Sequence, residues 1–182
     1  MNKLRLFTFL LLAAFFIQSC KKDTVVGTSY TTKPFQANVN STVWAPDADS
    51  TINTITYSST NKTKTFMLQG TKAQKQIIMN VILNNASNTP GFTTGTYDVD
   101  TTSVIIKFNT QVKSNGQYVF LPHGKVSAGS GTIFITAVDS VKKQITGTFN
   151  FYSRSVSSDG TTTVDNIFGG EFTSLPYTFT SN

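Results

Sequence analysis

The sequence predicts an all-β fold, either an antiparallel β-sandwich or a flattened barrel of about ten short strands. Apolar and polar residues alternate over many short segments, and Asn, Gly, Pro and Ser cluster between these segments as turn formers. Charged residues make up only 13% of the chain, whereas it holds 15 Phe and 6 Tyr. This composition is typical of pleated sheets with one apolar and one hydroxyl-rich side. The alternation does not distinguish a sandwich from a barrel, so both remain open.

The alternation begins after Pro34. In Phe35–Val39 the first, third and fifth residues are apolar and the two between them are polar amides, as expected for a half-buried strand. The expected strands are, in order, Phe35–Val39, Val43–Ala45, Thr51–Ser58, Lys64–Gly70, Gln76–Asn84, Thr94–Val99, Ser103–Thr110, Gln117–Leu121, Gly131–Asp139, Gln144–Ser153 and Thr162–Thr173.

Gln76–Asn84 is the one segment that also fits a helical period, through its four Ile and Val residues. Its short length and its β-branched residues favour a strand. Because both of its faces are largely apolar, we expect a central strand that is covered on both sides.

The first 19 residues differ from the rest of the chain. Lys3 and Arg5 precede an almost wholly apolar run from Leu6 to Ile17, and the small residue Ser19 follows. A basic start, a short apolar run and a small residue before a cleavage site are typical of a secretory signal peptide. The run is too short to span a bilayer, which takes about 20 apolar residues.

Ile17-Gln18-Ser19-Cys20 resembles the lipobox of bacterial lipoproteins, although Gln18 departs from the small or aliphatic residue usual at its position. The resemblance implies cleavage between Ser19 and Cys20 and attachment of fatty-acyl chains such as palmitate to Cys20. Two or more acyl chains hold a protein firmly on a membrane. Cys20 is the only cysteine, so no disulfide framework is expected.

We therefore expect a lipoprotein signal peptide over residues 1–19, a flexible tether over 20–33 and a single β-sandwich domain over 34–182. Removing the signal peptide takes away two basic residues, so the formal charge falls from +6 to +4. The remaining charges are scattered along the chain, which argues against a nucleic-acid partner.

From Phe35 onward the chain resembles a group of Bacteroidetes-type outer-membrane lipoproteins that form a β-rich family of unknown function. The segments that carry the likeness are "FQANVNSTVWAP" (35–46) and "GTIFITAVDSVKKQITGTFNFYSRS" (131–155). Ser41 stands where the group has a glycine. The resemblance implies a lipid-anchored β domain in the cell envelope, on the periplasmic face or the cell surface. It implies no activity.

The sequence offers little for catalysis, so we expect no enzyme, no metal and no cofactor. His123 is the only histidine, and it lies in a turn between Pro122 and Gly124. A zinc site needs three or four His, Cys or carboxylate ligands, more than this chain provides. The remaining candidates for acid–base or calcium chemistry are the pairs Asp47/Asp49 and Asp98/Asp100 and the single glutamate, Glu171. Asp residues at strand ends are usually turn residues, which favours a structural role for both pairs.

Two further features concern recognition and modification. Trp44, the only tryptophan, would stack on a sugar or anchor a partner if exposed, but its place in an alternating strand favours the core. Four Asp-Ser/Thr sites resemble the O-glycosylation sequon of exported Bacteroidetes proteins. Their candidate acceptors are Thr24, Ser50, Thr101 and Ser140.

These observations favour a lipid-anchored envelope protein whose β domain binds a partner, a glycan or an envelope protein, without catalysis. The alternative is a lipocalin-like barrel that encloses a small apolar ligand, which the abundant phenylalanines allow.

Overall fold

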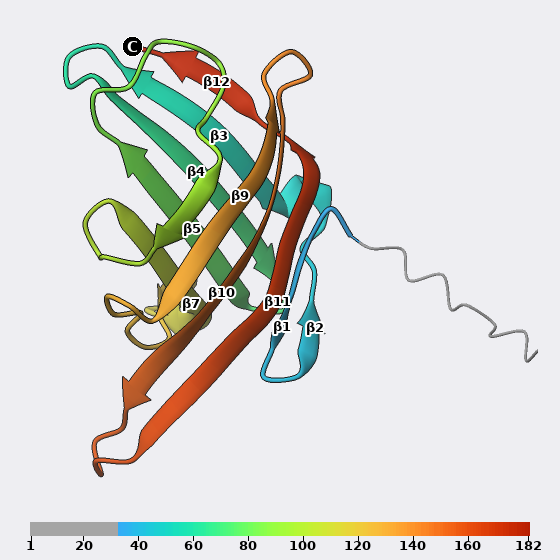
Figure 1. Cartoon of the computed structure of the whole chain (residues 1–182). Coiled ribbons are helices and arrows are strands. Elements are labelled where there is room, and N and C mark those ends of the chain that lie inside the picture. Colours follow the sequence, from blue (N-terminus) through green and yellow to red (C-terminus); the bar gives the residue numbers. More distant parts are fainter. Residues whose placement is uncertain (1–32) are drawn as a thin grey trace, which may run out of the picture. The chain divides into compact units, whose positions relative to one another are not determined.

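The computed structural model describes residues 33–182, which form two facing six-stranded β-sheets (Figure 1). Sheet A holds, in spatial order, β2 (Thr42–Trp44), β1 (Phe35–Val39), β11 (Thr162–Pro176), β10 (Gln144–Val156), β9 (Gly131–Asp139) and β6 (Gly95–Asp98). Sheet B holds β12 (Thr178–Ser181), β3 (Thr51–Ser58), β4 (Thr63–Lys72), β5 (Lys75–Leu83), β7 (Val104–Ser114) and β8 (Gln117–Pro122). A short 3₁₀ turn, η1 (Ala48–Ser50), precedes β3.

The all-β prediction is confirmed, and the two sheets decide between its two forms. Each sheet ends in its own pair of edge strands, β2 and β6 in sheet A and β12 and β8 in sheet B. The sheets therefore do not close into a barrel, and the fold is a β-sandwich. The barrel of the lipocalin-like alternative is wrong for this chain.

The space between the sheets is filled by apolar side chains from both. The largest fully buried side chains include five phenylalanines: Phe35, Phe66, Phe108, Phe149 and Phe172. The ring of Phe35 lies 5.8 Å from that of Phe149 within sheet A, and Phe66 lies 5.9 Å from Phe172 across the sandwich. Fully burying one such side chain contributes about 1.5–3 kcal/mol. Packing of this core, with no disulfide expected, is what stabilises the domain.

β5 lies in the middle of sheet B, between β4 and β7, as its apolar pattern predicted. Its inner face is buried through Ile77, Met79 and Val81. The expectation that it is covered on both sides is wrong, because Ile78 and Ile82 on its outer face are only partly buried. The sandwich has two layers, so only neighbouring side chains of sheet B shield that face.

β12 was not predicted. It runs parallel to β3, with Phe179 opposite Ile55, and forms an edge of sheet B. All other strand pairs in the described part of the chain are antiparallel. A four-residue strand with one large apolar residue carries too little local pattern to be recognised from sequence.

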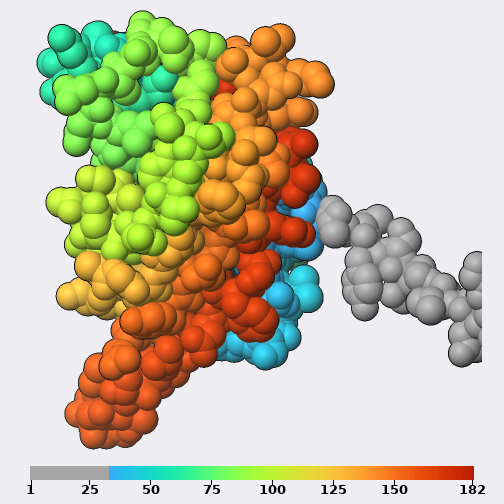
Figure 2. All heavy atoms as spheres, in the orientation of Figure 1, coloured from blue at the N-terminus to red at the C-terminus, as the bar shows by residue number. Residues whose placement is uncertain are grey.

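β10 and β11 are the longest strands, and their connecting end projects beyond the rest of the domain (Figure 2). Val156 and Val164 on this projection are exposed. Within residues 33–182, no helix is long and apolar enough to cross a membrane.

Candidate functional site

The outward side of sheet A carries a hollow of about 540 Å³ over β9, β10 and β11. We call it the outer hollow and define it by Thr132, Asn150, Tyr152, Asn166, Phe168 and Gly169. Strand alternation explains its position, because Phe149 and Phe151 point into the core and Asn150 and Tyr152 therefore point outward.

Strand register brings the side chains of the outer hollow together. Asn150 on β10 lies opposite Thr132 on β9, and Tyr152 lies opposite Asn166 on β11. Phe168 projects on the same side, next to the irregularity in the pairing of β10 with β11. Tyr152 is 41% exposed and Phe168 is 47% exposed, so both rings offer apolar surface to solvent.

The lining of the outer hollow contains hydroxyls, side-chain amides and aromatic rings, but no charged residue. Amides and hydroxyls both donate and accept hydrogen bonds, and exposed rings bind apolar faces of a ligand. This combination suits an uncharged ligand that is rich in hydroxyl groups.

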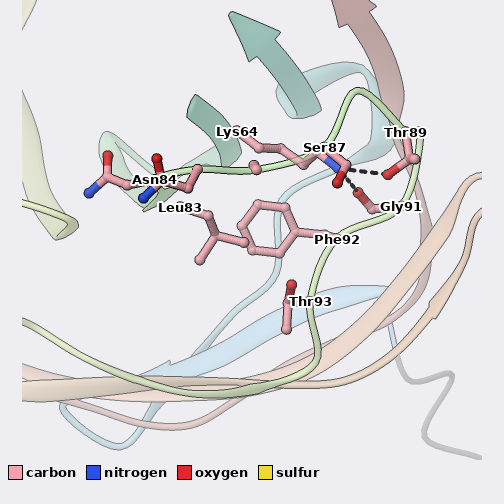
Figure 3. Close-up of a pocket in the computed structure, with 10 residues that line it drawn as sticks. Lys64, Leu83, Asn84, Ser87, Thr89, Gly91, Phe92 and Thr93 are labelled. Carbon is pink, nitrogen blue, oxygen red and sulfur yellow. Dashed lines mark hydrogen bonds between the residues drawn. The ribbon is translucent and has the colours of Figure 1, made fainter. Parts of the chain in front are cut away.

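A second cavity, of about 490 Å³, lies at an end of sheet B beside Lys64 (Figure 3). Lys64 is on the inward face of β4, in the same alternation as Phe66 and Leu68, and it is only 5% exposed. Its ammonium donates hydrogen bonds of 2.9 Å to Thr89 Oγ1 and to the carbonyl oxygen of Gly91. Both acceptors belong to the loop of residues 84–94 that closes this end of the sandwich.

Burial lowers the pKa of Lys64 below its ordinary value of 10.5, because the charged form is desolvated. Between the lowered pKa and about 10.5, the unfolded chain holds a proton that the folded chain has lost. The contribution of Lys64 to the free energy of unfolding therefore rises with pH across this window.

This titration predicts a difference between the wild type and Lys64→Met. The wild type is expected to gain stability relative to the variant as pH rises toward 10.5, with a slope of at most about 1.4 kcal/mol per pH unit. Urea unfolding of both proteins at a series of pH values measures the difference, and subtraction removes the titration of the tyrosines. If the stability of the wild type relative to the variant fell with rising pH, the lowered pKa of Lys64 would be contradicted.

A buried carboxylate, Asp165 on β11, lies close to two polar side chains from other elements. Asp165 Oδ1 accepts a hydrogen bond of 2.6 Å from Asn40 Nδ2, in the turn between β1 and β2. His123 Nε2 lies 3.3 Å from Asp165 Oδ2, at ion-pair distance but without hydrogen-bond alignment. The His123 ring also packs edge-on against Phe108. His123 is therefore only partly exposed, and its ring lies over the buried carboxylate of Asp165.

Ser153 lies opposite Asp165 on the neighbouring strand β10, so a serine, a histidine and an aspartate meet here. Nucleophilic catalysis needs a serine hydroxyl that is bonded to its base and open to substrate. Ser153 is completely buried, and its hydroxyl has no hydrogen-bond partner among the described residues. The nitrogen of His123 that is closest to this cluster faces the carboxylate of Asp165. This geometry supports a structural role for Asp165. Its carboxylate holds the β1–β2 turn, through Asn40, and the connection after β8, through His123, against β11.

A smaller hollow of about 310 Å³ lies where the chain enters β1, lined by Pro34, Phe35, Pro46, Leu175 and Pro176 among others. Asn53 also lines it and donates to the carbonyl oxygens of Leu175 and Pro176. Its walls are mainly apolar, so a small apolar group fits in this hollow even though the sheets do not form a barrel.

Trp44 lies in the core and is only 3% exposed. Its ring packs edge-on against Phe35 at 5.3 Å, and its Nε1 donates to the carbonyl oxygen of Lys72. The indole therefore has no free face on which a sugar could stack. The core position that the strand alternation favoured is the one observed, and the alternative role as a binding residue does not fit this burial.

The aspartate pairs have structural partners. Asp47 forms ion pairs with Lys33 (3.0 Å) and Lys72 (2.7 Å), and hydrogen bonds from these two lysines lower its pKa. Asp100 Oδ1 accepts hydrogen bonds from the backbone N–H groups of residues 102, 103 and 104, which lower its pKa.

The other acids sit in similar surroundings. Asp98 accepts from Thr132 Oγ1, and Glu171 accepts from Gln36 Nε2. Asp49 lies in η1. Within residues 33–182, no three His, Cys, Asp or Glu side chains are placed to hold a metal ion together.

Three candidate glycosylation acceptors lie in surface turns, with Thr101 and Ser140 exposed and Ser50 partly buried. Asp100 and Asp139 each accept a backbone N–H from two residues further along, which accounts for an aspartate at both positions. The remaining predictions, namely Ser19, Cys20 and Thr24, lie outside the described residues.

Sequence reasoning missed Lys64, Asp165 and the outer hollow. The signal for the first two was the strand alternation itself, since Lys64 shares a face with Phe66 and Asp165 shares one with Ile167. The outer hollow had no such signal, because its residues come from three strands whose register is not readable from the sequence.

The described residues define a class of protein, an all-β two-sheet sandwich with hollows on its surface. No family model, no curated protein and no solved structure matches this chain.

Proposed function

We propose that this chain is a lipid-anchored protein of the bacterial cell envelope whose β-sandwich binds a neutral glycan in the outer hollow. The observation that carries the binding half of this proposal is the pairing of two half-exposed rings, Tyr152 and Phe168, with the amides of Asn150 and Asn166. The lipobox-like segment that ends at Cys20 supports the anchor.

The chemistry of the outer hollow favours a saccharide over a protein partner. A sugar ring has an apolar face that packs on an aromatic ring, and a rim of hydroxyls that exchange hydrogen bonds with amides. The lining has no charge with which to attract a charged ligand or to select a charged protein surface.

The length of the expected tether limits how far the domain can lie from the membrane. Residues 20–33 separate Cys20 from the domain, and a fully extended chain of this length spans at most roughly 50 Å. Phe168 pairs with Asn38, toward the end of β1 that is away from Pro34. The part of β11 that lines the outer hollow therefore pairs with the end of β1 that is farther from the tether.

The binding proposal predicts that Tyr152→Ala and Phe168→Ala each weaken glycan binding about tenfold, which corresponds to the loss of about 1.4 kcal/mol of ring contact. The full-length protein in detergent would be titrated with neutral polysaccharides and oligosaccharides immobilised on an array. Phe134→Ala is the matched control, because Phe134 is exposed on the same side of sheet A but does not line the outer hollow.

Retention of binding by Phe134→Ala together with loss in the other two variants is the expected pattern. Equal loss in all three variants would contradict a site at the outer hollow. Failure of the wild type to bind any neutral glycan, with capture of a defined envelope protein instead, would overturn the choice of ligand.

A further inference from the structure

The cavity beside Lys64 is a different site from the outer hollow and shares no lining residue with it. It lies on sheet B, it is lined by a buried lysine, and its walls include the side-chain amides of Asn84 and Asn85 and the hydroxyls of Ser87 and Thr93. Figure 3 shows Lys64 reaching along the cavity toward Thr89 and Gly91, with Phe92 and Leu83 beneath it.

The charge of Lys64 lacks a counter-ion in the described part of the chain. Its two hydrogen-bond acceptors, Thr89 Oγ1 and the Gly91 carbonyl, are both neutral, and none of the ion pairs within residues 33–182 includes it. An ammonium has three donors, so one N–H remains beyond these two bonds. A buried charge is normally paired with an opposite charge, because desolvation costs several kcal/mol.

One acid near this loop, Asp139, is already engaged. Ser140 lies beside Gly91, and the preceding residue, Asp139, accepts the backbone N–H groups of Val141 and Lys142. The side chain of Lys142 also approaches the Asp139 carboxylate. No acidic residue is among the residues that line the cavity.

We propose that this cavity binds a small oxyanion, a carboxylate or a phosphate group, which serves as the missing counter-ion of Lys64. The anion accepts the remaining N–H of the ammonium, and the amide N–H groups of Asn84 and Asn85 and the neighbouring hydroxyls supply further donors. The volume of about 490 Å³ is ample for such a group together with part of the molecule that carries it.

The walls of the cavity are held in place independently of a ligand. Ala86 donates its backbone N–H to the carbonyl oxygen of Lys62, and the hydroxyl of the buried Tyr177 donates to the carbonyl oxygen of Pro90. These bonds fix the loop at two points on either side of Ser87. Little ordering is therefore needed on binding, which favours affinity.

The test is calorimetric titration of the full-length protein in detergent with inorganic phosphate and, separately, with glucuronate. Saturable binding of either anion is expected, with an affinity at least tenfold lower in Lys64→Met, which keeps the apolar stem and removes the charge. Lys62→Met is the matched control: it removes the same charge two residues away, at a side chain that does not line the cavity, and is expected to change the affinity less than twofold. Binding of phosphate alone identifies a phosphate site, and binding of glucuronate alone identifies a carboxylate site.

A second measurement avoids the variant altogether. In the wild type, the NMR signal of the Lys64 side-chain nitrogen is expected to shift on titration with the anion that binds, whereas the signal of Lys62 stays constant. The proposal is overturned if neither anion binds saturably at millimolar concentration, if Lys64→Met binds as tightly as the wild type, or if the Lys64 signal does not respond.

Discussion

Gly147→Ala is expected to lower the free energy of unfolding by about 3 kcal/mol, a large fraction of the 5–15 kcal/mol that is typical of a domain. Gly147 lies on β10 at an irregularity in its pairing with both neighbouring strands. A Cβ atom at this position would overlap the backbone carbonyl oxygen of Phe134 and the ring of Phe172, with Phe172 Cε2 at 2.8 Å. Phe172 is completely buried, so its ring has no free space into which to move.

Urea unfolding monitored by circular dichroism measures this effect. The control is Gly91→Ala, because the nearest atom to a Cβ at Gly91 is Ser140 Cβ at 3.6 Å, an ordinary contact. We expect this control to change stability by less than about 1 kcal/mol. A Gly147→Ala protein that unfolds at the same urea concentration as the wild type would show that the packing around Phe172 is looser than its complete burial implies.

Cys20→Ser is expected to move almost all of the protein out of the membrane fraction, or to leave it as an uncleaved precursor. The reason is that serine lacks the sulfur that the lipobox resemblance implies as the point of lipid attachment, and the domain itself has no membrane-spanning helix within residues 33–182. Fractionation of cells and the intact mass of the purified protein measure both outcomes.

Ser19→Ala is the matched control, since alanine keeps a small residue before the cleavage site and leaves the cysteine in place. It is expected to stay in the membrane fraction. Membrane retention of a processed Cys20→Ser protein would refute the anchor. Protease treatment of intact cells then distinguishes a surface location from a periplasmic one.

The fold was largely predictable because alternation with a period of two is a local property of the sequence. Phe35–Val39, Thr51–Ser58 and Gly131–Asp139 begin and end where the alternation placed them. β12 was missed because its stability comes from pairing with β3, far away in the sequence, and from a single partly buried ring, Phe179.

The candidate sites were less predictable than the strands. Alternation assigns Asp165 to an inward face, but it does not show that His123, from the connection after β8, lies over it. The loop over Lys64 poses the same difficulty, because its contacts depend on how it folds back across the end of sheet B. Local patterns give the orientation of a side chain, whereas a site depends on which distant side chains share its surroundings.

The pairing of β1 with β11 has a consequence for the order of events during synthesis. Gln36 and Glu171, which are bonded across these strands, are 135 residues apart, so β1 has no partner in sheet A besides β2 until β11 has been made. Contacts between segments so far apart in the sequence form slowly, and all-β sandwiches fold in about milliseconds to seconds. β1 and β2 therefore remain a two-stranded hairpin, which is marginally stable at best by itself, until most of the chain has been synthesised.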